Sequence, residues 1–120
     1  MVYLSGDTGQ TGDMRTIVRD FYKADLAVVH MGDIFSMGPE EAAFAVKQLV
    51  RPRAVIPEHA NEAATTGGAV NPGTRTERFI QLVTSDDSDG DDHRRRIAVH
   101  VPLSGVTVEF DGNGKCVAGC

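Results

Sequence analysis

The fold of this chain is decided by one stretch near its start, Tyr3-Leu4-Ser5-Gly6-Asp7-Thr8-Gly9. An apolar, β-prone run stops abruptly at Gly6-Asp7, and a Thr-Gly turn follows. This order predicts a strand whose carboxyl end carries one carboxylate, on a loop that leads into a helix. In open α/β sheets such strand ends open onto the crevice where ligands bind.

The same arrangement occurs twice more along the chain. The apolar run Leu26-Ala27-Val28-Val29-His30-Met31 leads into Gly32-Asp33, and Ala54-Val55-Ile56 leads into Pro57-Glu58-His59. If the three strands are parallel, their polar end residues gather along one edge of one sheet. Those residues are Asp7, Asp33, Glu58 and His59.

Length and composition are typical of a single domain spanning residues 1–120. A chain of 120 residues with 41% apolar residues is typical of one globular domain. The net charge is −5, and five acids lie in one short loop, Asp86 to Asp92, so the remaining charges balance. We therefore expect no nucleic-acid partner, which would need clustered positive charge, and no membrane span, which would need about 20 consecutive apolar residues.

The cysteines and the start of the chain predict a cytoplasmic location. Cys116 and Cys120 form neither a disulfide framework nor a zinc motif by spacing alone. The chain enters a strand directly after Met1, which leaves no room for a signal peptide. The glycine-rich tail from Asp111 is expected to be frayed.

The first half of the chain reads as β-α-β-α-β. A helix is expected after Asp13, ending near Tyr22-Lys23, and a second one from Pro39 to Arg51-Pro52. The first has apolar residues at i, i+3, i+4 and i+7, namely Met14, Ile17, Val18 and Phe21. Strands over 25–31 and 53–57 complete the pattern, which implies a parallel sheet.

The second half is expected to hold one helix and a closing antiparallel hairpin. Residues 60–73 read as a loop, and Thr74 with Glu77 matches a capping box that opens a short helix. The hairpin would join Ile97–Leu103 to Val106–Phe110. The acidic run from Asp86 reads as a solvated loop, because its spacing does not fit a calcium loop.

Asp7 and His59 are the strongest candidates for chemistry. A carboxylate can bridge two metal ions and a neutral imidazole can bind one. Each residue also has a plain alternative: Asp7 as a turn or capping residue, and His59 as a solvent-facing loop histidine. Asp33, Glu58 and His30 are weak candidates for a third ligand. His30 lies within a strand, where a buried, hydrogen-bonded histidine is favoured over a ligand.

Three blocks of this sequence together resemble the metallo-β-lactamase superfamily, and most of all the hydrolases similar to ascorbate-6-phosphate lactonase. The blocks are Ser5–Gly9, Met31–Ala42 and Val55–His59, and the resemblance runs from residue 2 to about residue 110. It implies an αββα sandwich of two similar halves, of which this chain would be the second. It also implies that Asp7 bridges two metals, that His59 is the last ligand of one, and that Asp33 and Met37 lie in a substrate-binding segment.

The resemblance implies a metal-dependent hydrolase that uses Zn or Mn. A metal-bound hydroxide would attack an ester, lactone, amide or phosphoester bond of a small-molecule substrate. The family's H-x-H-x-D-H motif is absent from this sequence. Two ligands, Asp7 and His59, would leave an ion mostly hydrated, so weak metal binding is expected. The alternative is a non-catalytic interaction module; a nucleotide-binding domain is disfavoured because no glycine fingerprint is present.

The same resemblance implies a partner for one sheet face. In the family that face packs against the other half of the sandwich. Here it would be lined by Leu4, Val29, Val55 and Val99, or by their neighbours of opposite parity. We expect it to be covered by the missing amino-terminal half or by a second copy of the chain in a homo-oligomer.

Overall fold

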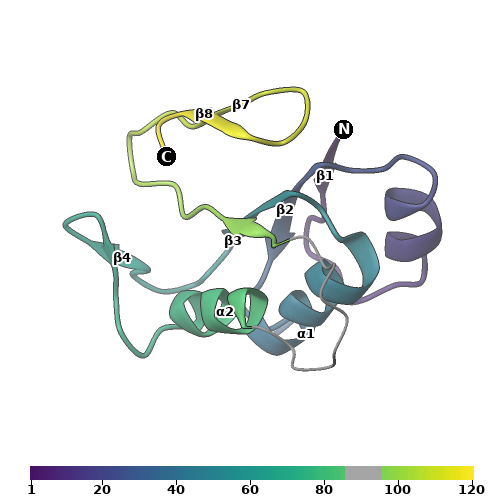
Figure 1. Ribbon diagram of the computed structural model, residues 1–120. Helices are drawn as coiled ribbons and strands as arrows, with labels where there is room; N and C mark the ends of the chain where they lie inside the picture. The colour runs from purple at the N-terminus through teal and green to yellow at the C-terminus, as the bar shows by residue number, and fades with distance from the viewer. Residues whose placement is uncertain (86–95) are drawn as a thin grey trace.

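A computed structural model describes residues 1–85 and 96–120 of the chain. Its centre is a parallel sheet in the order β1-β2-β3-β6 (Figure 1). The sheet strands are β1 (Val2–Leu4), β2 (Leu26–His30), β3 (Ala54–Glu58) and β6 (Ala98–Val99). The expected α/β class with a mostly parallel sheet is confirmed.

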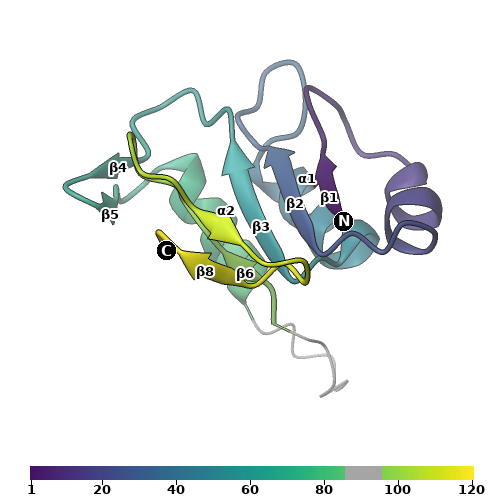
Figure 2. The same cartoon turned by 90° about the horizontal axis from the view of Figure 1, so that it is seen from above.

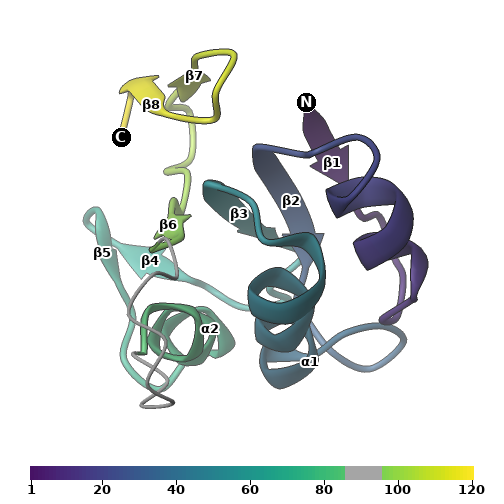
Figure 3. The same ribbon diagram turned by 45° about the vertical axis from the view of Figure 1, so that its right-hand side comes forward.

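The helices form a layer against one face of this sheet, as Figures 1 and 3 show. They are the π-helices η1 (Met14–Arg19) and η2 (Ala45–Val50), and the α-helices α1 (Pro39–Phe44) and α2 (Arg75–Thr84). The core between the layers contains Val29, Val55, Val46 and Phe79, each at most 1% exposed. These apolar side chains are the main source of stability, because burial of such a side chain contributes roughly 1.5–3 kcal/mol.

The other face of the sheet is partly open. It is not lined by all four of the residues expected there from the sequence. Leu4 pairs in register with Val28, so it lies on the face opposite Val29. Val29 and Val55 are buried under the helices, whereas Leu4 is 70% exposed. The set Leu4, Val29, Val55 and Val99 therefore mixes two faces, because successive strand side chains alternate.

The first helix departs from its expected buried face. Met14 is buried, but Ile17 is 44% and Phe21 74% exposed. The segment is a π-helix, whose wider turn rotates the side chains away from the spacing of an α-helix. Asp13 lies at its N-cap position without a side-chain capping hydrogen bond.

The segment expected to be a loop contains a small hairpin. β4 (Thr65–Thr66) pairs antiparallel with β5 (Ala69–Val70). The two residues between them, Gly67 and Gly68, both have positive φ (57° and 87°), which suits a tight two-residue turn. The turn chemistry specifies this hairpin, since its strands are too short to show alternation.

The closing antiparallel hairpin is present but starts later than expected. Ala98–Val99 pairs parallel with β3 instead of folding back on 106–110. The hairpin is formed by β7 (Glu109–Phe110) and β8 (Cys116–Ala118), on the helix-free side of the sheet (Figures 1 and 3). At its turn the N–H groups of Lys115 and Asn113 donate to Asp111 Oδ1, which holds the pKa of that carboxyl below its usual value.

The tail is thus ordered, and its two cysteines are paired. Cys116 and Cys120 form a disulfide, whereas the sequence indicated no disulfide framework and a frayed tail. Spacing alone could not indicate this pairing, because it depends on the path of the chain after β8. No helix within residues 1–85 and 96–120 is long and apolar enough to cross a membrane. The acidic run from Asp86 to Asp92 lies outside the described residues.

Candidate metal centre

The candidate centre lies where three neighbouring parallel strands end. Asp7 follows β1 by three residues, His30 is the last residue of β2, and His59 directly follows β3. The arrowheads of these strands meet at one edge of the sheet in Figure 2. Parallel pairing of β1 with β2 and of β2 with β3 therefore brings together side chains from residues far apart in the sequence.

Asp7 is the middle member of this cluster. Its Oδ1 lies 3.1 Å from His30 Nδ1 and 3.8 Å from His59 Nδ1. The two imidazole rings are stacked at a tilt of 32°, with centroids 5.1 Å apart. Each of the three residues offers one ligand atom within 4.8 Å of the others.

His30 is the member that the sequence indicated only as a weak third ligand, with a buried, hydrogen-bonded histidine favoured. It is buried as expected, at 5% exposure. However, neither ring nitrogen has a hydrogen-bond partner within the described part of the chain, because the short approach to Asp7 is poorly aligned. A buried polar atom without a partner costs free energy, so an ion bound to a ring nitrogen of His30 would remove part of this cost.

The spacing of the three side chains suits one metal ion. A tetrahedral ion bonded at about 2.0–2.2 Å holds its nitrogen and oxygen ligands roughly 3.3 Å apart. The two distances from Asp7, 3.1 and 3.8 Å, lie on either side of this value. Asp7 and His59 are well exposed, so a fourth position would face solvent. Three protein ligands with one open position is the arrangement of a catalytic zinc site.

The backbone around His59 is shaped by a close approach. His59 itself has a positive φ of 53°, and its carbonyl oxygen packs directly over Gly32 Cα, where a Cβ would clash. Asn61 Nδ2 donates to the Gly32 carbonyl oxygen at 3.4 Å. Left-handed non-glycine residues cost about 1–3 kcal/mol and cluster at functional sites. The position of the imidazole therefore depends on the loop after β2 as well as on β3.

The other candidates lie apart from this cluster. Among the described residues, neither Asp33 nor Glu58 contributes to it. Asp33 is exposed and accepts a hydrogen bond from the N–H of Ile34. Met37 is 2% exposed and lines a shallow pocket of about 360 Å³. The pocket is bounded by the loops after β1 and β2 and by α1, through Gly9, Gln10, Ile34, Phe35, Ser36, Met37 and Glu41.

Half of this chain is similar to hydrolases described as metal-dependent. A UPF0173 metal-dependent hydrolase of Pelotomaculum thermopropionicum is 55% identical over 60 residues, which are 50% of this chain and 25% of that protein. A relative from Methanosphaera stadtmanae is 50% identical over 60 residues, with the same coverage. One from Cupriavidus necator is 50% identical over 58 residues, covering 48% of this chain and 20% of that protein. The matched segment thus spans a quarter or less of each relative.

The fold has a neighbour among solved structures. Igni18, a metallo hydrolase from the archaeon Ignicoccus hospitalis, superposes with a TM-score of 0.51 at 20% identity. The superposition covers 96% of this chain and 40% of Igni18. At this identity the likeness establishes the fold alone. No protein-family model matches the chain.

Proposed function

We propose that this chain carries part of the metal site of a metal-dependent hydrolase related to the metallo-β-lactamase superfamily. The observation that carries the proposal is the convergence of Asp7, His30 and His59 at adjacent strand ends. The similarity to metal-dependent hydrolases over half of the chain supports the same conclusion. The chain would correspond to one half of a two-half sandwich, as its 40% coverage of Igni18 suggests.

Asp7, His30 and His59 would hold the ion, and two imidazoles with one carboxylate suit Zn²⁺ or Mn²⁺. When bound, such an ion acts as a Lewis acid and makes water nucleophilic at neutral pH. Asp7 is exposed and its contacts to the two histidines are made by Oδ1, so Oδ2 could bind a second ion, which fits the bridging role proposed for Asp7.

The substrate would be a small molecule with an ester, lactone, amide or phosphoester bond, and a lactone is the narrower proposal. The pocket lined by Met37 and bordered by the loop that contains Asp33 supports a substrate-binding role for this segment. The proposed location is the cytoplasm. The Cys116–Cys120 disulfide argues against this location, because disulfides are rare in reducing compartments.

Metal titration by calorimetry tests the site, with the disulfide intact. We expect one Zn²⁺ or Mn²⁺ per chain, and at least about tenfold weaker binding in His30→Ala, Asp7→Ala and His59→Ala. Asp33→Ala is the matched control, since it removes a nearby exposed carboxylate outside the cluster. Equal binding by all four variants would show that the cluster is not a metal site.

Activity is tested with ester, lactone and phosphodiester substrates. We expect none from the chain alone, and hydrolysis when the amino-terminal half implied by the resemblance, taken from a relative, is added. Asp7→Asn should then abolish most of the rate, while Asp20→Asn, an exposed aspartate on the helix layer, should leave it unchanged. Hydrolysis that survives Asp7→Asn would contradict the proposed role of this carboxylate.

A non-catalytic interaction module is the second candidate. It is favoured by the absence of the H-x-H-x-D-H motif from this sequence. The metal content of the purified chain distinguishes the two candidates. One metal ion per chain would argue for the hydrolase, and no bound metal after the chain is incubated with metal would argue for the module.

A further inference from the structure

A second group of ligand-type side chains lies beside β6, the outermost strand on the far side of the sheet from β1. His100 directly follows β6, Cys116 begins β8, and Cys120 is the last residue of the chain. One ligand atom from each lies within 4.8 Å of the others. β1 and β6 are the two outermost strands of the sheet, three strand spacings apart. Across the sheet, His100 on the β6 side is therefore about 14 Å in total from Asp7 on the β1 side.

His100 is held in place from two sides. Its backbone N–H donates to the Val55 carbonyl oxygen at 2.9 Å, which ties it to β3. Its ring packs edge-to-face on Phe110, with centroids 5.2 Å apart and planes at 77°. Phe110 is in turn the β7 partner of Cys116. The imidazole and the first sulfur are therefore positioned by the same aromatic side chain and its strand pairing.

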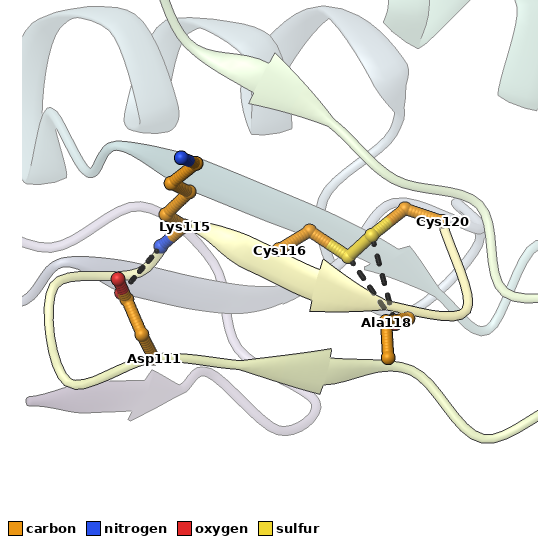
Figure 4. The surroundings of a disulfide bond; sticks show 5 residues. All are labelled: Asp111, Lys115, Cys116, Ala118 and Cys120. Atoms are coloured by element: carbon orange, nitrogen blue, oxygen red, sulfur yellow. Dashed lines mark hydrogen bonds between the residues drawn. A yellow bond between two sulfur atoms is a disulfide. The ribbon is translucent and has the colours of Figure 1, made fainter.

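Cys120 is brought back to this group by a close backbone contact. Gly119 has a positive φ of 79°, and the Thr107 carbonyl oxygen occupies the space that a Cβ would need. The Cα atoms of Cys116 and Cys120 are 6.4 Å apart, and both sulfurs lie near the Ala118 carbonyl oxygen, at 3.4 and 3.6 Å (Figure 4). The last residue is thus directed toward β8.

We propose that reduction of the Cys116–Cys120 disulfide creates a Zn²⁺ site with His100 as the third ligand. Two thiolates and one imidazole are donors that Zn²⁺ prefers, and three protein ligands suffice for a site with an open position. The disulfide and the metal site exclude each other, because only the thiolate binds metal. The group therefore acts as a redox-gated metal site, separate from the centre at Asp7.

Reduction of the Cys116–Cys120 disulfide balances with a dithiol as the reductant. Thiol–disulfide exchange passes two electrons to the Cys116 and Cys120 sulfurs, and the dithiol becomes a disulfide. Two protons end on the two cysteine sulfurs. Zn²⁺ then binds both sulfurs and releases these two protons. Exchange with a small-molecule disulfide runs the reaction in reverse: the two electrons pass to that disulfide, which takes up two protons and becomes two thiols, while the Cys116–Cys120 bond re-forms and the ion is released.

Cobalt binding to the full chain tests the proposal. The chain is reduced with a phosphine, which takes up a water oxygen as it is oxidised, and is then desalted without oxygen. Thiolate ligands give Co²⁺ an intense near-ultraviolet charge-transfer band that carboxylate and imidazole ligands do not give. We expect this band at one Co²⁺ per reduced chain, its loss on adding Zn²⁺, and no band in the oxidised chain.

Variants assign the ligands. Cys120→Ser should lose the band, and His100→Phe should weaken Co²⁺ binding at least about tenfold while keeping the ring contact with Phe110. His100→Gln replaces His100→Phe if circular dichroism shows that His100→Phe is unfolded. His59→Ala should keep the full band, so failure here is distinct from failure of the Asp7 centre.

Two outcomes would overturn the proposal. Absence of the band in the reduced chain would mean that the cysteines only tie the last residue to β8. An unchanged band and affinity in both His100→Phe and His100→Gln would exclude the imidazole as a ligand.

Discussion

Gly32 illustrates how a residue without chemistry positions one with it. It lies between β2 and Asp33, and the His59 carbonyl and Asn61 side chain occupy the space next to its Cα. A side chain at this position would displace the loop that carries His59, and with it one of the proposed ligands. The requirement for glycine here comes from contact with a residue 27 positions further along the chain.

Gly32→Ala should therefore destabilise the chain by about 2 kcal/mol or more and weaken metal binding. The reason is steric, because the added Cβ meets backbone atoms that cannot rotate away. Urea unfolding and metal calorimetry measure the two effects. Gly112→Ala is the control: it has open space and an ordinary φ, so a change within about 0.5 kcal/mol is expected. Equal stability of the two variants would contradict the close approach.

At the scale of elements, helix starts are set by local capping. Thr74 Oγ1 accepts a hydrogen bond from the Glu77 N–H at 3.1 Å, as the capping-box pattern predicts. The Glu77 carboxylate accepts from the Gly73 N–H at 2.7 Å. At α1, Pro39 occupies the first turn and Glu41 accepts from the Gly38 N–H. These contacts span at most four residues, so the sequence pattern alone indicates them.

Thr74→Ala should cost about 1 kcal/mol, because the Glu77 N–H loses its acceptor. The free energy of unfolding in urea is the measurement. Thr84→Ala is the matched control at the other end of α2, where the hydroxyl only donates to the Ile80 carbonyl on an exposed surface. A change within about 0.5 kcal/mol is expected there. A larger loss for Thr84→Ala than for Thr74→Ala would contradict the capping role.

At the scale of the whole molecule, one sheet face remains to be covered. Helices cover the face with Val29 and Val55, while Val2 and Leu4 on the other face are 55% and 70% exposed. The β7–β8 hairpin lies on this side without covering β1 (Figure 3). We propose that the remaining part of a longer fold covers this face, and that a second copy does so in the isolated chain.

The isolated chain should therefore form a homodimer at micromolar concentration, measured by light scattering. Leu4→Lys should shift it to monomer, because a charge at the centre of the interface has no partner. Phe21→Lys replaces an equally exposed apolar side chain on the helix layer and should leave the dimer intact. A folded monomer that binds no hydrophobic dye would refute the interface.

The elements of the first half, the helix after Thr74 and two of the proposed ligands were open to prediction from sequence. Apolar runs ending at Gly6-Asp7 and Pro57-Glu58-His59 placed Asp7 and His59 at strand ends, and Pro39 and Thr74 marked helix starts. Each of these signals is local. The apolar face expected for the first helix was wrong at Ile17 and Phe21, because the segment is a π-helix that ends at Arg19 and does not keep the spacing of an α-helix.

By itself the sequence determined the α/β class, the parallel direction of the first three strands and the polar residues at their ends, because periodicity and turn chemistry act within a few residues. Only the tertiary structure decided the partners of those residues. It placed the His30 ring beside Asp7 with no hydrogen bond to either ring nitrogen from the described residues, and it brought His100 beside Cys116 and Cys120. It also placed Leu4 and Val29 on opposite faces. The physical reason is that register, close backbone approach and side-chain convergence are set by packing between residues far apart in the chain, which no local pattern encodes.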